Sequence, residues 1–263
     1  MATLASLLEN TLVVVAHPDD EVIGCGVLMQ RMEQVRVVFA TDGAPLDKKF
    51  WPKHDTREQY TSVRKLEACD ALAYAEVDRI EYLTDSEGTT IPDQELFRNL
   101  DAAAESLRRM VERVSPKILL TLAYEGGHPD HDCCNFLVHH IASQSGVLAW
   151  EMPLYHLGNG GLVRQTFRAK DNTELMLDPS FNENKTKQLM TAAYSSQADF
   201  LMTFSSSGER FRPLLADRYD YFHPPHEGQL NYESWGWPMT GADLCSAFAD
   251  FLHARLTADR RSA

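Results

Sequence analysis

Residues 16–21, Ala-His-Pro-Asp-Asp-Glu, place one histidine beside three consecutive carboxylates, directly after an apolar run. Such a cluster is costly to bury, because the carboxylates repel one another and each loses its water. One interpretation is a polar cap on the following helix, where Asp is favoured. The other is that His17 and the carboxylates hold a metal ion, since imidazole nitrogens and carboxylate oxygens are zinc ligands.

A second cluster of the same kind follows a second apolar run. Residues 128–132 read His-Pro-Asp-His-Asp and come shortly after the run Lys-Ile-Leu-Leu-Thr-Leu-Ala at 117–123. If both runs are strands of one parallel sheet, both clusters lie at its carboxyl edge, where such sheets bind ligands. A helix cap or a structural histidine explains either cluster alone. The pair predicts a metal site.

The residue types in the two clusters suggest a division of roles. We expect His17, Asp20 and His131 to bind the metal, because two His and one carboxylate leave coordination positions open for water. Asp19 then lies beside the metal as a general base, and His128 can polarise a carbonyl or protonate a leaving group. Non-haem iron oxygenases use a similar set with His-x-Asp spacing in a β-barrel. The spacing here is His-x-x-Asp, so zinc is expected, with Fe²⁺ as an alternative occupant.

The elements that must position these residues alternate between strands and helices. Apolar runs predict strands over 11–16, 35–43, 79–83 and 117–123, with a further strand over 152–157, and helical periodicity predicts helices over 21–34, 57–75, 94–114, 132–144, 183–193 and 241–256. Continuous apolar strands separated by helices predict an α/β fold with a mainly parallel sheet covered on both faces. The Gly-Cys-Gly at 24–26 lies inside a helix and lacks a third glycine, which disfavours a dinucleotide-binding loop.

Bulk composition narrows the class of protein. The chain has 263 residues, 44% hydrophobic and 24% charged, which fits one globular domain over 1–263. Its 25 Lys and Arg against 38 Asp and Glu give a net charge of −13, which disfavours nucleic acids and anionic membranes as partners. No apolar stretch reaches the roughly 20 residues of a membrane span. The five cysteines lack Cys-x-x-Cys spacing, and the amino-terminal residues lack a basic region, so a cytoplasmic location without a signal peptide is expected.

Both motifs resemble those of a known family, the PIG-L or LmbE-like deacetylases, which remove acetyl groups from N-acetylglucosamine units on larger molecules. The hexapeptide at 16–21 is similar to the first motif of that family, and His-Pro-Asp-His at 128–131 to the second. Weaker similarities extend the resemblance over about residues 11–211; they are Thr-Asp-Gly at 41–43, the segments 64–72 and 187–197, and Glu-Arg-Phe at 209–211.

The resemblance implies a Rossmann-like fold, zinc on the three ligands given above, and the same roles for the base and the second histidine. It also implies that Arg64 and Asp42 face the sugar, together with Tyr194, which stands where some relatives have a histidine. Residues 212–263 form an aromatic-rich carboxyl-terminal extension that matches no general motif of the family. Its aromatic residues could form a sugar-stacking wall, a subunit interface or a packed core, and His223 and His226 are candidates for lining the pocket.

The expected function is therefore a zinc-dependent hydrolase that removes the N-acetyl group from an N-acetylglucosamine-type sugar in a small-molecule conjugate. A metal-bound water would be the nucleophile, with Asp19 as its base. One alternative is hydrolysis of another amide at the same metal site. Another is a non-catalytic glycan-binding protein, although a binding protein has no need of a base beside the metal. The oligomeric state, including a homo-oligomer, stays open.

Overall fold

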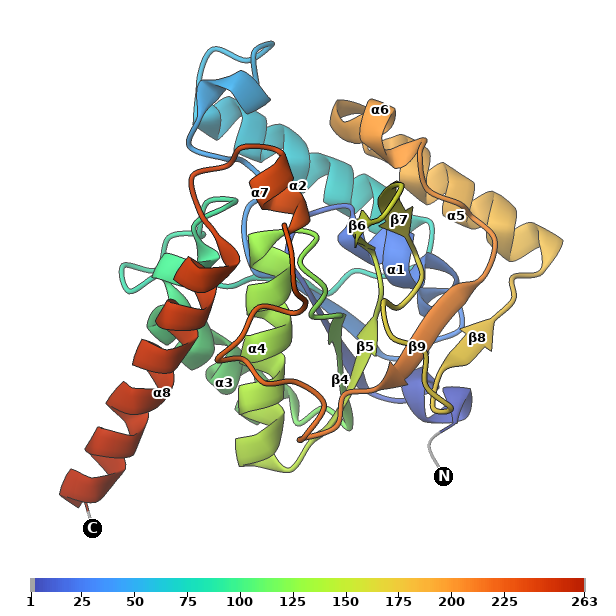
Figure 1. Ribbon diagram of the computed structural model, residues 1–263. Helices are drawn as coiled ribbons and strands as arrows, with labels where there is room; N and C mark the ends of the chain where they lie inside the picture. Colours follow the sequence, from blue (N-terminus) through green and yellow to red (C-terminus); the bar gives the residue numbers. More distant parts are fainter. Residues whose placement is uncertain (1–2, 263) are drawn as a thin grey trace.

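A seven-stranded sheet forms the centre of the computed structural model, which describes residues 3–262 and their side chains as far as residue 257 (Figure 1). The strand order is β3-β2-β1-β4-β5-β9-β8. The first five strands in this order are parallel, whereas β9 runs antiparallel to its neighbours β5 and β8. The strands are β1 (Thr11–Val15), β2 (Val35–Phe39), β3 (Ile80–Tyr82), β4 (Ile118–Leu122), β5 (Leu148–Met152), β8 (Leu175–Leu177) and β9 (Glu209–Pro213).

Helices cover both faces of this sheet, as the alternating sequence pattern predicts. On one side α1, α2 and α5 pack together, and on the other α3, α4 and α8 do so (Figure 1). The short helices α6 and α7 and the hairpin of β6 (Tyr155–Gly158) and β7 (Gly161–Arg164) lie outside these layers. The helices are α1 (Asp20–Met29), α2 (Arg57–Ala73), α3 (Leu100–Val114), α4 (Pro129–Ser145), α5 (Phe181–Ala193), α6 (Ala198–Leu201), α7 (Asn231–Ser234) and α8 (Gly241–Ser262).

The order of the strands explains why the two polar clusters meet. The chain moves outward from β1 through β2 to β3, and then returns by α3 to β4 on the other side of β1. The connections leaving β1 and β4 therefore diverge to opposite faces, and a crevice opens at the carboxyl ends of these strands. The first cluster follows β1 and the second follows β4. The expected α/β fold with a mainly parallel sheet is confirmed, and every residue of β1 and β4 is buried.

Some element boundaries differ from the sequence prediction. The helix expected from residue 94 begins only at Leu100, because Gln94 has a left-handed backbone with φ of 69° and a short 3-10 turn follows. The helix expected from residue 132 begins at Pro129, so the second motif itself forms its first turn. The strand expected over 152–157 is divided between the end of β5 and the start of β6, with Pro153 in the gap. The extent of the single predicted domain stays a prediction, and its residues 1, 2 and 263 lie outside the described residues.

Helix α1, which begins beside the first cluster, is interrupted in its middle. Cys25 has non-helical dihedral angles, so the backbone N–H of Val27 does not reach the carbonyl of Ile23. A buried ion pair takes its place: Lys187 of α5 donates through Nζ to the Ile23 carbonyl at 2.9 Å, and Glu209 of β9 accepts from Val27 N at 2.7 Å. The second Glu209 oxygen accepts from Leu28 N. Lys187 and Glu209 thus satisfy the groups that the break exposes.

The aromatic side chains of the carboxyl-terminal extension have several different surroundings. Tyr221 and Tyr232 are buried in the core, where Tyr221 packs against residues of α4 and α8. Phe222 is exposed to solvent. Trp235 and Trp237 turn toward the polar clusters and line a cavity there. The extension therefore serves partly as core and partly as one wall of the cavity.

Candidate active site

The first cluster occupies the turn between β1 and α1. The carboxylate of Asp20, at the start of α1, accepts a hydrogen bond from the backbone N–H of His17 at 2.8 Å. Asp19 has a left-handed backbone with φ of 119°, a strained conformation for a residue with a side chain. Glu21 stabilises this strained backbone by accepting the Asp19 N–H at 2.9 Å. The turn therefore directs Asp19 toward the cavity.

The second cluster forms the amino terminus of α4. His128 is the N-cap residue, and its Nδ1 accepts the backbone N–H of Asp130 at 3.1 Å, which leaves Nε2 facing the first cluster. Pro129 follows as the first helical residue, a position that proline favours. His131 lies two positions further on, with a buried ring. Helix geometry thus fixes both histidines relative to the same turn.

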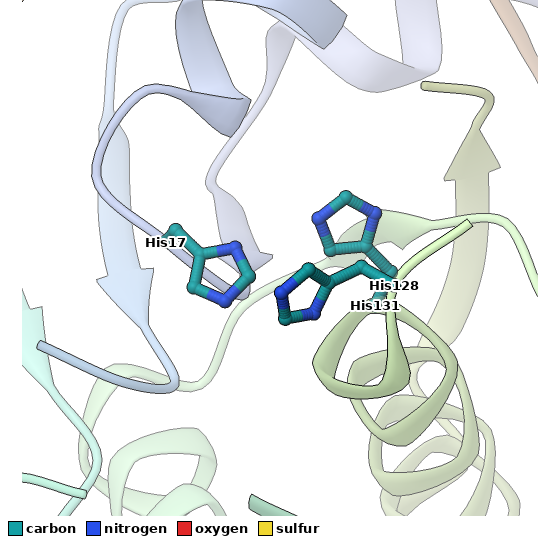
Figure 2. A group of neighbouring side chains, drawn as sticks. All are labelled: His17, His128 and His131. Atoms are coloured by element: carbon teal, nitrogen blue, oxygen red, sulfur yellow. The ribbon is translucent and has the colours of Figure 1, made fainter. Parts of the chain in front are cut away.

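Three imidazole rings converge where the two clusters meet (Figure 2). One ring nitrogen from each of His17, His128 and His131 lies within 4.8 Å of the other two. The ring centroids of His17 and His128 are 4.3 Å apart, and those of His17 and His131 are 5.4 Å apart. The side chains come from segments more than a hundred residues apart, as the sequence predicts.

Carboxylates surround these rings without forming good hydrogen bonds to all of them. Asp20 Oδ1 lies 3.2 Å from His131 Nε2, yet neither His131 nitrogen has a hydrogen-bond partner. Asp93 Oδ1 lies 3.2 Å from His17 Nε2 and 3.4 Å from His128 Nε2, and it too lacks a partner in hydrogen-bond geometry. Buried polar atoms without partners are rare and call for an explanation. Nitrogen and oxygen atoms that face a common centre fit a metal ion such as zinc.

The charges of the two clusters shift the pKa of each group. Burial opposes protonation of His17, but Asp93, Asp130 and Asp20 raise its pKa well above the usual value. Burial acts in the opposite sense on Asp20, whose pKa is nevertheless held well below its usual range by His131 and His17. Burial, together with the charge of His17, lowers the pKa of His128. Ionised Asp20 is the form that can bind a cation. Neutral His128 is the form that can both accept and donate a hydrogen bond through its two ring nitrogens.

Asp19 has a different environment from Asp20. Burial raises the pKa of Asp19 to about 6, although Arg64 lowers it. Arg64 is buried, lines the cavity, and donates through Nη2 to Asp19 Oδ2 at 2.8 Å. It also contacts Glu67, which accepts hydrogen bonds from the turn at 195–196. A carboxylate with a pKa near neutrality and one well-placed partner has the properties of a general base.

The structure does not bring two of the expected substrate-binding residues to the cavity. Both oxygens of Asp42, in the loop that follows β2, accept from Arg57 at 2.6 Å, and Asp42 is buried. Tyr194 is fully buried and donates its hydroxyl to Glu21, with the guanidinium of Arg64 over its ring. These contacts support neighbouring residues of the site. Their direct contact with substrate stays a prediction, as does that of Arg64.

A cavity of about 350 Å³ opens above the clusters. Its polar wall consists of His17, Asp19, Asp20, Arg64, Asp93, Gln94 and His128, and its aromatic wall of Phe50, Tyr60, Tyr155, Phe200, Trp235 and Trp237. His223 and His226, two candidates from the sequence, are absent from the lining. His223 is exposed and pairs with Asp220 on the surface.

Sequence reasoning missed Asp93, which reaches the centre of the site. It lies in the loop after β3, and Asp130 holds that loop by accepting from the backbone N–H groups of Gln94 and Leu96 at 2.6 and 3.2 Å. Asp85, the other acidic residue after this strand, instead accepts backbone hydrogen bonds within a turn. The sequence did contain a signal for this residue. Asp93 lies in the loop after a strand of the same parallel sheet, so it comes from the same carboxyl edge as the two clusters.

Comparison with known proteins gives both sequence and structural relatives. The family model "PIG-L: GlcNAc-PI de-N-acetylase" matches residues 12–142. A curated protein of Bacillus subtilis (strain 168), "Probable N-acetyl-alpha-D-glucosaminyl L-malate deacetylase 2", is 27% identical over 132 residues. That match covers 48% of this chain and only 57% of the relative.

Solved structures share the fold at lower identity. The A40926 pseudoaglycone deacetylase Dbv21 superposes with a TM-score of 0.62 at 16% identity, covering 80% of this chain and 99% of its own. The 4-carboxy-2-hydroxymuconate hydratase GalB of Pseudomonas putida KT2440 gives 0.51 at 15% identity, covering 80% and 98%. At such identities these likenesses show the fold alone. The family match includes both histidine motifs and the strands that carry them, and the chain belongs to the PIG-L/LmbE-like family.

Proposed function

We propose that this protein is a zinc-dependent N-deacetylase acting on an N-acetylglucosamine-type amino sugar in a conjugate. The observation that carries the proposal is the convergence of buried imidazoles and Asp20 at the base of the cavity, with Asp19 beside them. The partnerless nitrogens of His131 fit a cation. The family match and the deacetylase name of the curated relative agree with this chemistry.

His17, Asp20 and His131 would hold the zinc ion, which supplies Lewis acidity to the amide carbonyl and lowers the pKa of a water molecule. The short contacts between Asp20 and both of these histidines support this ligand set. Two further side chains approach His17: Asp93 Oδ1 lies 3.2 Å from its Nε2, and the ring centroid of His128 lies 4.3 Å from its own. Nitrogen and carboxylate ligands also suit Fe²⁺, which is the alternative occupant.

Asp19 would accept the proton of the attacking water and deliver it to the departing amine. Its position at the cavity surface and the partnership with Arg64 support this role. His128 would donate a hydrogen bond from Nε2 to the developing oxyanion, since its Nδ1 already accepts the Asp130 N–H. A donor of this kind typically contributes about 3 kcal/mol to transition-state stabilisation. Arg64 would hold Asp19 in place while the sugar occupies the cavity.

The proposed partner is a small-molecule amino-sugar conjugate. Among the residues that the structure describes, no helix combines the length and apolar character needed to cross a bilayer. The cytoplasmic location and the oligomeric state stay predictions.

Acetate release from a panel of N-acetylglucosamine conjugates, measured on zinc-loaded protein, tests the proposed reaction. We expect acetate from at least one conjugate, and its absence across the panel with zinc bound would favour a glycan-binding role. Release of a different acid from another amide would favour the alternative hydrolase.

Two variants test the metal site. His131→Ala should lose most of the zinc, and full retention would rule out the proposed ligand set. His128→Ala should retain zinc and lose about 10²–10³-fold in kcat. His139→Ala, a change further along α4 and outside the cavity, is the matched control and should resemble the unmodified protein in both measurements.

A further inference from the structure

The aromatic wall of the cavity forms a continuous row of rings, which we call the aromatic arc: Phe50, Trp237, Trp235, Tyr155 and Phe200. Neighbouring ring centroids along it are 5.8, 5.2, 6.2 and 5.5 Å apart. These spacings lie within the range of about 4.5–7 Å for interacting aromatic pairs. The rings come from the loop after β2, the carboxyl-terminal extension, β6 and α6. Long-range folding has therefore assembled one apolar surface from four separate segments.

The arc begins at the proposed reacting centre. Trp237 packs edge-on against His128, with centroids 4.9 Å apart, and Tyr155 packs against His131 at 5.2 Å. From there the arc leads outward to Trp235, which is 43% exposed. A large ring that remains half exposed at the mouth of a cavity gains little from folding and is available to a ligand. The arc thus extends from the proposed reacting centre to the mouth of the cavity.

The cavity is too small for a whole conjugate. Its volume of about 350 Å³ is at the lower end of the roughly 300–1,000 Å³ found for ligand pockets. The polar wall, with Asp93 and Gln94, suits the hydroxyl groups and the acetamido group of one sugar. The rest of the conjugate must then extend out of the cavity along the aromatic arc.

Charge on the polar wall bears on the chemistry of that remaining group. Among the described residues that line the cavity, Arg64 is the only lysine or arginine, beside the carboxylates of Asp19, Asp20 and Asp93. Arg64 already donates to Asp19 and to the Pro18 carbonyl, and contacts Glu67. Away from the proposed zinc ligands, the lining thus offers an anionic group no free lysine or arginine. A carboxylate such as the malate in the name of the curated relative is disfavoured here.

We propose that the substrate is an N-acetylglucosaminide with an aromatic aglycone that packs on Trp235, Trp237 and Phe50. This inference rests on the proposed deacetylase function and adds the class of its substrate. Aromatic contacts with these mutually tilted rings need no counter-ion, and the contact of Trp237 with His128 places the arc next to the proposed reacting centre. Trp235 and Phe50 are then specificity-determining residues, because they contact the aglycone rather than the reacting atoms.

The test compares phenyl, methyl and malyl glycosides of N-acetylglucosamine, as both anomers, by kcat/KM for acetate release. The zinc-loaded protein should prefer the phenyl over the methyl glycoside, and the malyl glycoside should be the poorest. Removing one ring, by Trp235→Ala or Phe50→Ala, should lower the phenyl-to-methyl ratio by about 2- to 12-fold, as expected for one aromatic contact. Phe222→Ala is the matched control, because Phe222 is an exposed aromatic residue of the same extension outside the cavity, and should leave the ratio unchanged.

A phenyl-to-methyl ratio near one, a preference for the malyl glycoside, or a ratio that Trp235→Ala and Phe50→Ala leave unchanged would overturn the inference. Binding of the same glycosides, followed by calorimetry, separates this failure from failure of the proposed reaction. If no glycoside releases acetate, the deacetylase function is wrong. The methyl-to-phenyl ratio of the dissociation constants still tests the arc in that case, and it should fall by the same factor in the Trp235→Ala variant.

Discussion

The ion pair between Lys187 and Glu209 offers a sharp test of how the fold holds the first cluster. It repairs the break in α1, the helix that starts at Asp20. Lys187→Met would leave the Glu209 carboxylate buried without its cation, and the Ile23 carbonyl with only the longer hydrogen bond from Gln165 Nε2 at 3.4 Å. Breaking a buried pair on one side typically costs about 3–5 kcal/mol. We expect a loss of this size in the free energy of unfolding, a large part of the roughly 5–15 kcal/mol that stabilises a typical domain.

The double variant Lys187→Met/Glu209→Leu distinguishes this role from that of an ordinary buried ion pair. Replacing both partners by apolar residues often restores stability. Here it would leave the backbone N–H groups of Val27 and Leu28 without their acceptor, while the Ile23 carbonyl keeps its hydrogen bond from Gln165. At about 1–3 kcal/mol for each of these two buried unsatisfied groups, the double variant should remain about 2–6 kcal/mol less stable than the unmodified protein.

Urea unfolding followed by far-UV circular dichroism, on metal-free protein, measures both values. Arg108→Met is the control, because Arg108 forms solvent-exposed ion pairs within α3 and should change stability by about 1 kcal/mol or less. A double variant as stable as the unmodified protein would refute the idea that the pair replaces the missing helix bonds.

Three further predictions concern other parts of the structure. Gly127→Ala would place its new Cβ 1.9 Å from the carbonyl oxygen of Tyr155, so both zinc content and melting temperature should fall, whereas Gly160→Ala, in open space, should change neither. Burial between aromatic rings, with a smaller effect of Arg255, lowers the pKa of His140 to about 4. The pKa of histidine in the unfolded chain is higher, about 6.5. The stability that neutral His140 contributes is therefore complete above about pH 6.5 and is lost as the pH falls toward 4. His140→Leu should flatten this part of the stability profile in urea titrations, and an unchanged slope would contradict the assignment. Arg64→Met should raise the pKa of Asp19, since Arg64 lowers it, and so move the acidic limb of the pH–rate profile upward, unlike Arg57→Met, which affects Asp42 instead.

The strands and both clusters could be predicted because their signals are local. A buried parallel strand is a continuous apolar run, and each motif follows its strand directly, so the topology of the sheet brings His17 and His131 together. The start of α3 could not be predicted in this way. Its amphipathic pattern continues through residues 94–99, but hydrogen bonds from Gln94 and Leu96 to the distant Asp130 hold the backbone in another conformation.

The same limit applies to the side chains of the site. Asp42 and Tyr194 lie in segments that resemble the family, but only packing decides whether a side chain faces the cavity or, as here, a neighbouring residue. Asp93 and Trp237 reach the cavity from loops that tertiary contacts position. Aromatic content indicated several roles for the extension, and its rings are found in the core, in the arc and, for Phe222, at the surface.

The most direct test of the central claim is to measure bound zinc and acetate release together in the unmodified protein and in Asp19→Asn. The variant keeps the shape of the side chain and removes the base. We predict unchanged zinc content and a fall in kcat of about 10²–10⁴-fold. Loss of zinc together with activity would make Asp19 a ligand, and full activity in the variant would contradict its role as the general base.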